Sequence, residues 1–155
     1  MNPAPLDFAA LEARLDAIAE LPGDVAARDA NALAAELLAS AERILETWVL
    51  AHEGVPTDSR KEGFRLLALH AQGARGEPSF NACRETCREI VFQHNVIAAV
   101  TTGEERARAL RLMVMVVRHL SLFISGKLEV AGLGEFCCAS KPLRRSGEGL
   151  PAAAA

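Results

Sequence analysis

The chain has 155 residues, of which 50% are apolar and 24% charged, and its formal net charge is −3. This length suits one domain with a substantial core, and the apolar fraction excludes a disordered chain. Tyrosine is absent while Ala and Leu dominate, a balance that favours helix over sheet. The basic residues form no long runs and are not interleaved with aromatic residues, so nucleic-acid binding is not expected.

The charge is divided unevenly along the chain. Residues 1–62 carry 12 acidic and 5 basic side chains, whereas residues 63–155 carry 8 acidic and 12 basic ones. Two halves of opposite charge can attract each other inside one bundle, or the basic half can form a docking surface for an acidic protein partner. Arg111 and Arg118 are expected to pair with acidic residues of the first two helices or to clamp an anion.

The first part of the chain predicts two helices. Apolar residues at i, i+3, i+7 and i+10 indicate an amphipathic helix; they are Phe8, Leu11, Leu15 and Ile18. The sequence LPGD at residues 21–24 ends this helix. A longer helix is expected from about residue 24 to residue 53, and the glycine and proline of EGVP (53–56) stop it.

Two further helices are predicted in the middle of the chain. Ser59 and Glu62 have the spacing of a capping box, and they are expected to start a third helix that fades in QGARGEP (72–78). Pro78 and Ser79 open a fourth helix, which ends near Val100.

The fifth predicted helix is the most apolar. Thr101 and Glu104 repeat the capping-box spacing, and the helix is expected from about residue 103 to residue 125. Apolar residues cover most of its circumference, which is typical of a central helix. Gly126 is expected to end it, and KLEVAG (127–132) alternates enough to predict a short strand.

These elements predict an all-α fold, a four- to five-helix bundle with a short irregular C-terminal extension. Residues 1–140 are expected to form one domain and residues 141–155 a flexible tail. The apolar run at residues 110–124 is too short to span a bilayer, and residues 1–10 lack the pattern of a signal peptide. We therefore expect a cytoplasmic protein without membrane contact, whose four cysteines are reduced.

Two cysteines and a histidine stand out in FNACRETCREIVFQHN (80–95). At about 100° per helical residue, five side chains share one apolar stripe: Cys83, Cys87, Ile90, His94 and Ile97. We expect this stripe to face the core, with both thiols as packing groups. His94 lies roughly 10 Å along the axis from Cys87 and cannot complete a zinc site with bonds of about 2.0–2.3 Å. The alternative is a metal or redox site that uses Cys83 and Cys87 with distant ligands.

A second cysteine pair, Cys137 and Cys138, follows the sequence GLGEF. Packing at the end of the domain is expected there, with redox sensitivity as the alternative. The chain contains no Gly-rich phosphate loop, no G-x-S-x-G elbow and no H-E-x-x-H helix. No metal or other cofactor is therefore expected.

His70 is predicted to lie on the surface of the third helix. If Phe64, Leu67 and Ala71 mark the buried side of this helix, His70 falls about 120° away from Phe64. It is then an exposed imidazole with small neighbours, which leaves room for another protein to approach. The simpler alternative is a surface histidine that suits the negative end of the helix dipole.

The stretch LLALHAQGARGEPSFNACRETCREI (66–90) resembles the centre of a histidine-containing phosphotransfer domain, and the likeness extends over roughly residues 30–125. The resemblance implies a helical bundle in which His70 accepts a phosphoryl group from a receiver or kinase domain and passes it on. The usual His-x-x-Lys-Gly is replaced by His-Ala-Gln-Gly-Ala at residues 70–74. Arg75 is therefore expected to supply the positive charge.

The absence of an assembled catalytic set favours a non-enzymatic function. We expect a cytoplasmic regulator or adaptor of signal transduction that binds other proteins, built on a phosphotransfer-like scaffold. Two alternatives remain open at this point. One is a phosphorelay protein that uses His70, and the other is a metal- or redox-binding protein that uses Cys83 and Cys87.

Overall fold

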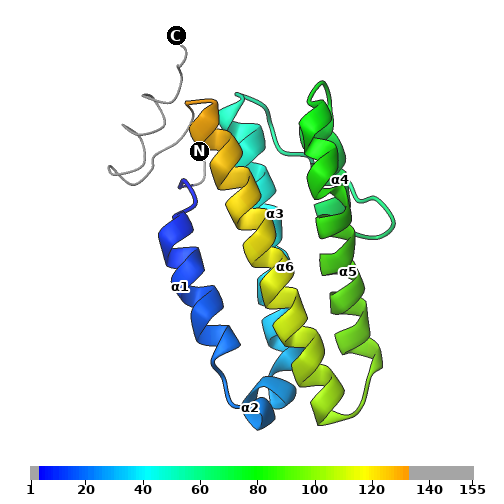
Figure 1. The fold of residues 1–155 in the computed structure, drawn as a ribbon. Coiled ribbons are helices and arrows are strands. Elements are labelled where there is room, and N and C mark those ends of the chain that lie inside the picture. Colours follow the sequence, from blue (N-terminus) through cyan, green and yellow to red (C-terminus); the bar gives the residue numbers. More distant parts are fainter. Residues whose placement is uncertain (1–3, 133–155) are drawn as a thin grey trace.

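The computed structural model describes residues 4–132, which form an all-α bundle (Figure 1). The elements in chain order are α1 (Phe8–Ala19), α2 (Gly23–Arg28), α3 (Ala30–Ala51), α4 (Arg65–Ala74), the 3₁₀-helix η1 (Pro78–Cys83), α5 (Arg84–Ala99) and α6 (Gly103–Val130). The expected all-α fold is confirmed. The predicted tail and the pair Cys137–Cys138 lie outside the described residues.

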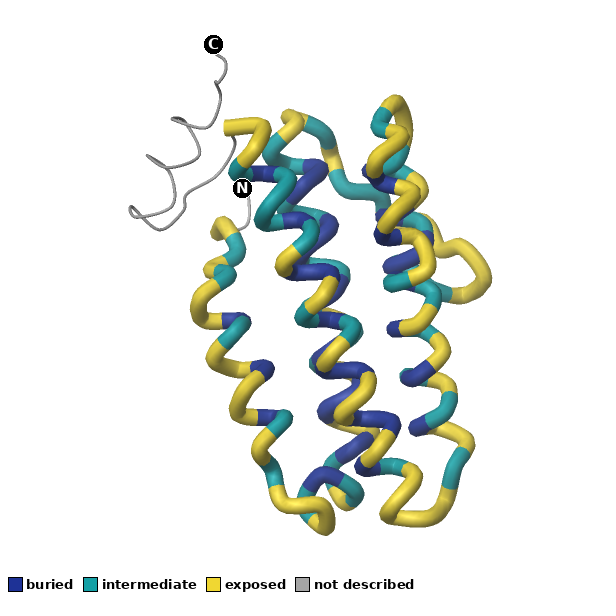
Figure 2. Tube along the Cα trace, viewed as in Figure 1, coloured by how far each residue is buried: buried dark blue, intermediate teal, exposed yellow. Residues whose placement is uncertain are grey.

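Helix α6 is the central element, as its composition predicted. It packs against α5, α3, α2 and α1, and Figure 1 shows it in front of α3, with α1 on one side and α4 and α5 on the other. The buried residues of these helices face one another in a continuous core, whereas the turns of α6 that face away from α3 are exposed (Figure 2).

By length and composition α6 would also pass for a membrane-spanning helix. The core helices of water-soluble proteins have the same properties, and 44% of its most apolar window is buried inside the bundle. The expectation of a protein without membrane contact stays a prediction.

The long helix predicted from residue 24 to residue 53 is divided in two. Asp29 leaves helical geometry, with φ −97° and ψ 9°, and separates α2 from α3. Its carboxylate accepts two hydrogen bonds from the guanidinium of Arg28, at 3.0 and 3.1 Å. The break turns α2 toward α6, against which it packs. No glycine or proline marks this position, so the sequence pattern runs through it.

The predicted capping box of Ser59 and Glu62 is wrong, because α4 begins only at Arg65. Glu62 and Gly63 both have positive φ, 54° and 86°, so the chain turns sharply where a first helical turn was expected. Arg65 then fixes the start of α4 by ion pairs with Glu46 and Glu42 of α3. Contacts with α3, rather than a local cap, set this boundary.

Helix α6 differs from its prediction at both ends. The N-cap is Thr102, one residue later than expected, and its Oγ1 accepts a hydrogen bond from the Glu105 amide at 3.3 Å. At the other end Gly126 lies inside the helix, and the predicted strand at residues 127–132 is wrong. Leu128 is buried one helical turn after Ile124, so burial continues with helical spacing and carries the helix on to Val130.

Candidate functional site

His70 is buried, which contradicts the predicted exposed imidazole. Only 7% of the residue is exposed, and its Nε2 donates a hydrogen bond to the carbonyl oxygen of Phe80 at 2.9 Å. The imidazole ring stacks on the Phe80 ring, with centroids 5.5 Å apart. Nε2 is therefore occupied, and the buried ring is covered by η1, so the imidazole is not presented to a phosphoryl donor.

The error came from the choice of the buried side of α4. Phe64 lies outside the helix, and the buried residues of α4 are Leu66, Leu67, Leu69, His70 and Gly73. Gly73 does not leave room for a partner protein. It lets α4 approach the core, because a Cβ at this position would lie 2.7 Å from the Phe80 ring and 3.2 Å from Trp48.

The prediction that Cys83 and Cys87 face inward is confirmed. Both are free thiols with no exposed surface. Cys83 is the residue before α5, and its thiol donates to the same Phe80 carbonyl as His70, at 3.2 Å. Ile90 and Ile97 continue the buried stripe, whereas His94 is only half-buried and packs edge-on against Phe64.

Cys83, Cys87 and His70 form a small polar cluster inside the core. A hydrogen bond with Cys87 lowers the pKa of Cys83 to about 6, against the effect of burial, and His70 acts in the same direction. The same thiol–thiol contact raises the pKa of Cys87 well above its usual value. Burial opposes the protonation of His70, but hydrogen bonds with Cys83 and the Phe80 carbonyl outweigh burial and raise its pKa.

This cluster can hold a proton, but it is closed to a substrate. Both sulfur atoms are covered, so no nucleophile is presented to solvent. Within residues 4–132, no group of three or more His, Cys, Asp or Glu side chains has the arrangement of a metal site. The cysteines act in this part of the chain as packing groups with internal hydrogen bonds.

The opposite charges of the two halves meet inside the bundle, one of the two outcomes that their distribution allowed. Arg118 of α6 pairs with Glu12, at 2.6 Å, and with Asp16 on α1, and Arg65 pairs with α3. Arg111 was expected to pair with an acidic residue of the first two helices or to clamp an anion. It has no ion pair with a described carboxylate. Among residues 4–132, Arg111 is thus an unpaired cation on the surface of α6.

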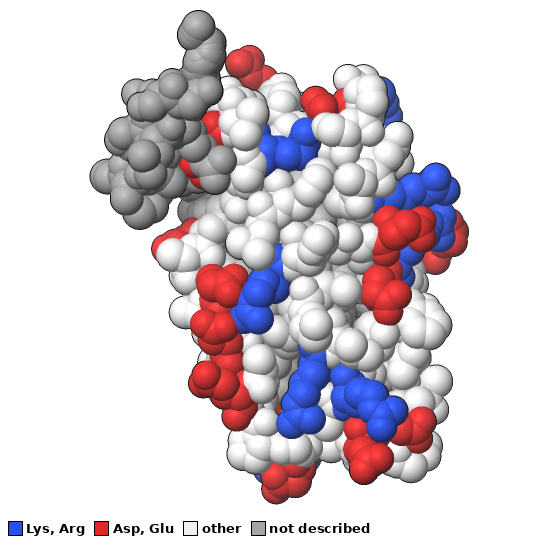
Figure 3. Space-filling view, in the orientation of Figure 1, with Lys and Arg blue, Asp and Glu red and all other residues white. Residues whose placement is uncertain are grey.

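The outward side of α6 carries an exposed apolar stripe. Leu112, Met115, Leu122 and Val130 are 40%, 62%, 62% and 72% exposed. With His119 and Gly126 they lie within about 80° of the helix circumference. Figure 3 shows the corresponding uncharged surface in the middle of this face, with acidic side chains along the edge formed by α1. The sequence showed an apolar helix, but not that one side would stay uncovered.

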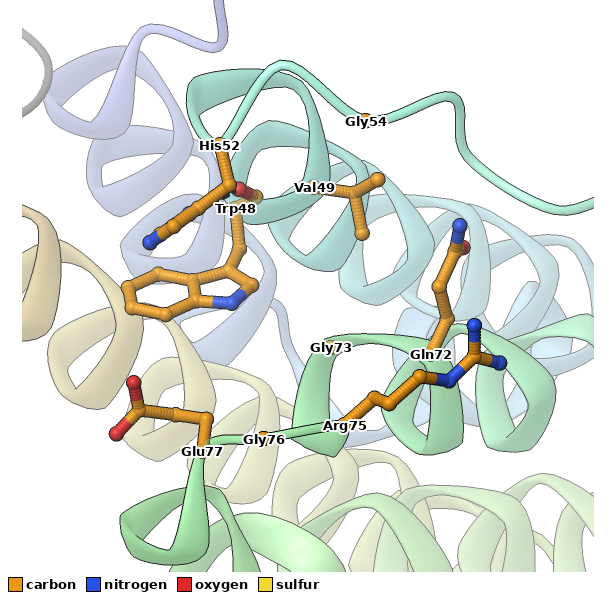
Figure 4. A pocket seen from close by; sticks show the side chains of 9 residues that line it. All are labelled: Trp48, Val49, His52, Gly54, Gln72, Gly73, Arg75, Gly76 and Glu77. Carbon is orange, nitrogen blue, oxygen red and sulfur yellow. Dashed lines mark hydrogen bonds between the residues drawn. The ribbon is translucent and has the colours of Figure 1, made fainter.

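Arg75 is exposed, but it does not share a surface with His70. It lines a pocket of about 280 Å³ together with Trp48, His52 and Glu77 (Figure 4). This pocket could not be predicted from the sequence, because its residues come from separate elements, the end of α3 and the turn after α4. The one available signal was the glycine-rich stretch at residues 72–78 that contains Arg75.

The chain was compared with protein-family models, with curated proteins and with solved structures. None of the three comparisons finds a match.

Proposed function

We propose that the chain is a non-catalytic cytoplasmic adaptor or regulator that binds an amphipathic helix of another protein along α6. The observation that carries this proposal is the exposed stripe of α6, which consists of Leu112, Met115, His119, Leu122, Gly126 and Val130. Large apolar side chains of this kind gain free energy when they are covered, about 1.5–3 kcal/mol for each full burial.

The spacing of the stripe favours a helix as the occupant. Its positions follow one another at intervals of three, four, three, four and four residues, the pattern of a helix–helix seam. Gly126, whose Cβ position is empty, provides a shallow place beside the larger side chain of Leu122. Such alternation supports the packing of a partner's side chains between those of α6.

The charges beside the stripe indicate which helix would fit. Arg111 has no acidic partner among the described side chains, and Arg108 is 66% exposed, with Glu104 3.7 Å away in the same helix. An exposed pair of this kind contributes little, so both guanidinium groups are available at one end of the stripe. The partner helix should therefore carry Asp or Glu at the end that meets them.

A phosphorelay role for His70 stays a prediction, and the geometry around this residue disfavours it. Phosphorylation would require η1 to move away from α4 and the hydrogen bond to Phe80 to break. A metal or redox role for Cys83 and Cys87 would require access to two fully buried sulfur atoms. The exposed surface of α6 needs no such rearrangement.

The proposal can be tested by photo-crosslinking in cells. A photoreactive amino acid is placed at Leu122 in the stripe and, as a matched control, at Val55, which is 83% exposed in a loop away from α6. We expect one discrete protein adduct from position 122 and none from position 55. Adding Met115→Lys should abolish the adduct without changing the thermal unfolding temperature.

Several results would contradict the proposal. They are equal adducts from both positions, an adduct that Met115→Lys leaves unchanged, and an adduct that contains only a second copy of this chain. Lipid adducts at position 122 would instead indicate a membrane surface as the occupant, and would also refute the proposed protein partner.

A further inference from the structure

The 3₁₀-helix η1 carries one of the two buried thiols but is itself held by few contacts. Of its six residues, Phe80 and Cys83 are buried and the other four are exposed. Figure 4 shows Gly76, which has a positive φ of 74°, in the short connection between α4 and η1. A partly exposed ion pair at 3.4 Å between Glu77 and Lys127 adds a weak tie to α6. Such a segment can detach at a much smaller free-energy cost than global unfolding.

The contacts that hold η1 in place meet at Phe80. Its ring packs against the rings of His70 and Trp48, with centroids 5.5 and 5.1 Å apart. Its carbonyl oxygen accepts hydrogen bonds from His70 Nε2 at 2.9 Å and from the Cys83 thiol at 3.2 Å. When η1 detaches, water can replace these partners, so the hydrogen bonds oppose detachment only weakly. The burial of one phenyl ring is the main restraint.

Detachment of η1 uncovers one thiol and leaves the other buried. Cys83 is the last residue of η1, so it moves with this segment. Cys87 lies one turn inside α5, which packs against α6 and α3, and its exposure requires α5 to leave the bundle. The two thiols are in contact in the closed state, but they differ in the opening that brings them to solvent.

The position of Cys83 favours reaction once it is exposed. It is the N-cap of the 16-residue helix α5, and the positive end of a helix dipole lowers the pKa of a cysteine thiol and favours the thiolate. The closed site has no room for a group added to the sulfur. Cys83 has no exposed surface, and even a Cβ on Gly73 would lie 2.7 Å from the neighbouring Phe80 ring. A group attached to Cys83 therefore prevents η1 from closing.

We propose that Cys83 is a site of reversible modification by small disulfides, which react with it when η1 detaches from α4. The Cys83 thiolate attacks one sulfur of the disulfide and forms a new S–S bond. The old S–S bond breaks, and the other half leaves as a thiolate that takes up a proton. The adduct holds η1 in the detached position and uncovers His70. A small thiol reverses the exchange and restores the closed state. This inference does not rest on the proposed binding along α6.

Dithiodipyridine, a small aromatic disulfide, serves as the probe. The reaction is run in the full chain with Cys137→Ser and Cys138→Ser, which leaves Cys83 and Cys87 as the two thiols. Peptide mass spectrometry measures the rate at each. We expect Cys83 to react at least about tenfold faster than Cys87. Its rate should change little with urea below the unfolding transition, because local detachment exposes little surface.

Two glycine variants distinguish local from global opening. Gly76 and Gly63 both have a positive φ, 74° and 86°, and a Cβ on either would meet no atom within 4 Å. Alanine strains both turns in the same way, but only the turn at Gly76 leads into η1. Gly76→Ala should accelerate the modification of Cys83 by about fivefold, because detachment releases the strain. Gly63→Ala should leave the rate unchanged within about twofold.

The modified protein should also report the displacement of η1. Trp48 is the only tryptophan of the chain, so its emission should change when Phe80 moves away, with the helical circular dichroism preserved. Dithiothreitol should restore the original emission. Several results would each overturn the proposal: no adduct at Cys83, equal rates at Cys83 and Cys87, equal acceleration by Gly76→Ala and Gly63→Ala, or an adduct at Cys83 that leaves the emission unchanged.

Discussion

The two sides of α6 have similar side chains and opposite surroundings. Met113 and Leu120 on the inner side have no exposed surface, whereas Met115 and Leu122 on the outer side are each 62% exposed. The same residue types therefore fill the core on one side and remain in solvent on the other. Hydropathy identifies such a helix as central, but only the positions of its neighbours decide which side they cover. The outer side chains of α6 do not take part in the packing of the core, so this apolar surface is available for binding.

Truncation of one leucine on each side should give the largest contrast. Leu120→Ala removes fully buried methyl groups and leaves a cavity, so we expect a loss of about 2–5 kcal/mol in the free energy of unfolding. Leu122→Ala should change it by no more than about 0.5 kcal/mol. Urea unfolding followed by circular dichroism measures both, and equal losses would mean that the outer side is covered.

Two glycine substitutions, one where α4 meets the core and one on the outer side of α6, should change the free energy of unfolding in opposite directions. Gly73→Ala inserts a methyl group 2.7 Å from the Phe80 ring, and overpacking of this kind costs about 1–3 kcal/mol. Gly126→Ala meets no atom within 4 Å on the outer side of α6, and it should stabilise the protein by about 0.5–1 kcal/mol through helix propensity. Thermal unfolding of both variants tests this, and destabilisation by Gly126→Ala would show a contact on the outer side.

The start of α6 provides a smaller effect. Thr102→Ala removes the side chain that accepts from the Glu105 amide, which should cost about 1 kcal/mol. Thr101→Ala is the matched control, because this exposed neighbour caps nothing in the structure. Denaturant unfolding distinguishes the two, and a larger loss for Thr101→Ala would restore the capping position that the sequence predicted.

The smallest effect concerns a surface ion pair between α1 and α3. The hydrogen bonds from Arg14 lower the pKa of Glu36. A depressed carboxyl pKa adds stability above the unfolded value of 4.5, and this stability is lost as the pH falls through the folded value. Because Arg14 is exposed and Glu36 is only partly buried, we expect less than about 1 kcal/mol.

Arg14→Gln should therefore reduce the acid-induced loss of stability below about pH 4.5. Arg60→Gln, whose guanidinium meets only the Gly63 carbonyl in the described structure, should not. Unfolding free energies at several acidic pH values test this difference. An identical pH dependence of Arg14→Gln and the wild type would show that the ion pair does not contribute to the acid-induced loss of stability.

Much of the fold could be predicted because its signals are local. The apolar spacing of Leu11, Leu15 and Ile18 was sufficient for α1. Pro78 marked the start of the predicted fourth helix, although its first six residues form the 3₁₀-helix η1 and α5 begins only at Arg84. The boundaries that failed depend on distant contacts. Asp29 breaks a helix that its own sequence favours, and Arg65 begins one by pairing with α3 rather than through a cap.

The candidate sites could be predicted only where burial follows from helix periodicity. Cys83 and Cys87 share a single apolar stripe, and they are buried as expected. His70 was misplaced because α4 is short, and its small residues left two possible inner sides. The pocket at Trp48 could not be found, since residues from α3 and the turn after α4 meet only through the folding of the whole bundle.

The way α1 is packed determines the order in which parts of the protein unfold. This helix packs mainly on α6, through three buried side chains, Leu11, Leu15 and Ile18. Its backbone amides should exchange with deuterium sooner than those of α3 and α6, because detachment of one peripheral helix exposes less apolar surface than global unfolding. Mild heating would then first produce a protein whose N-terminal segment is accessible to proteases while the remaining helices are still assembled.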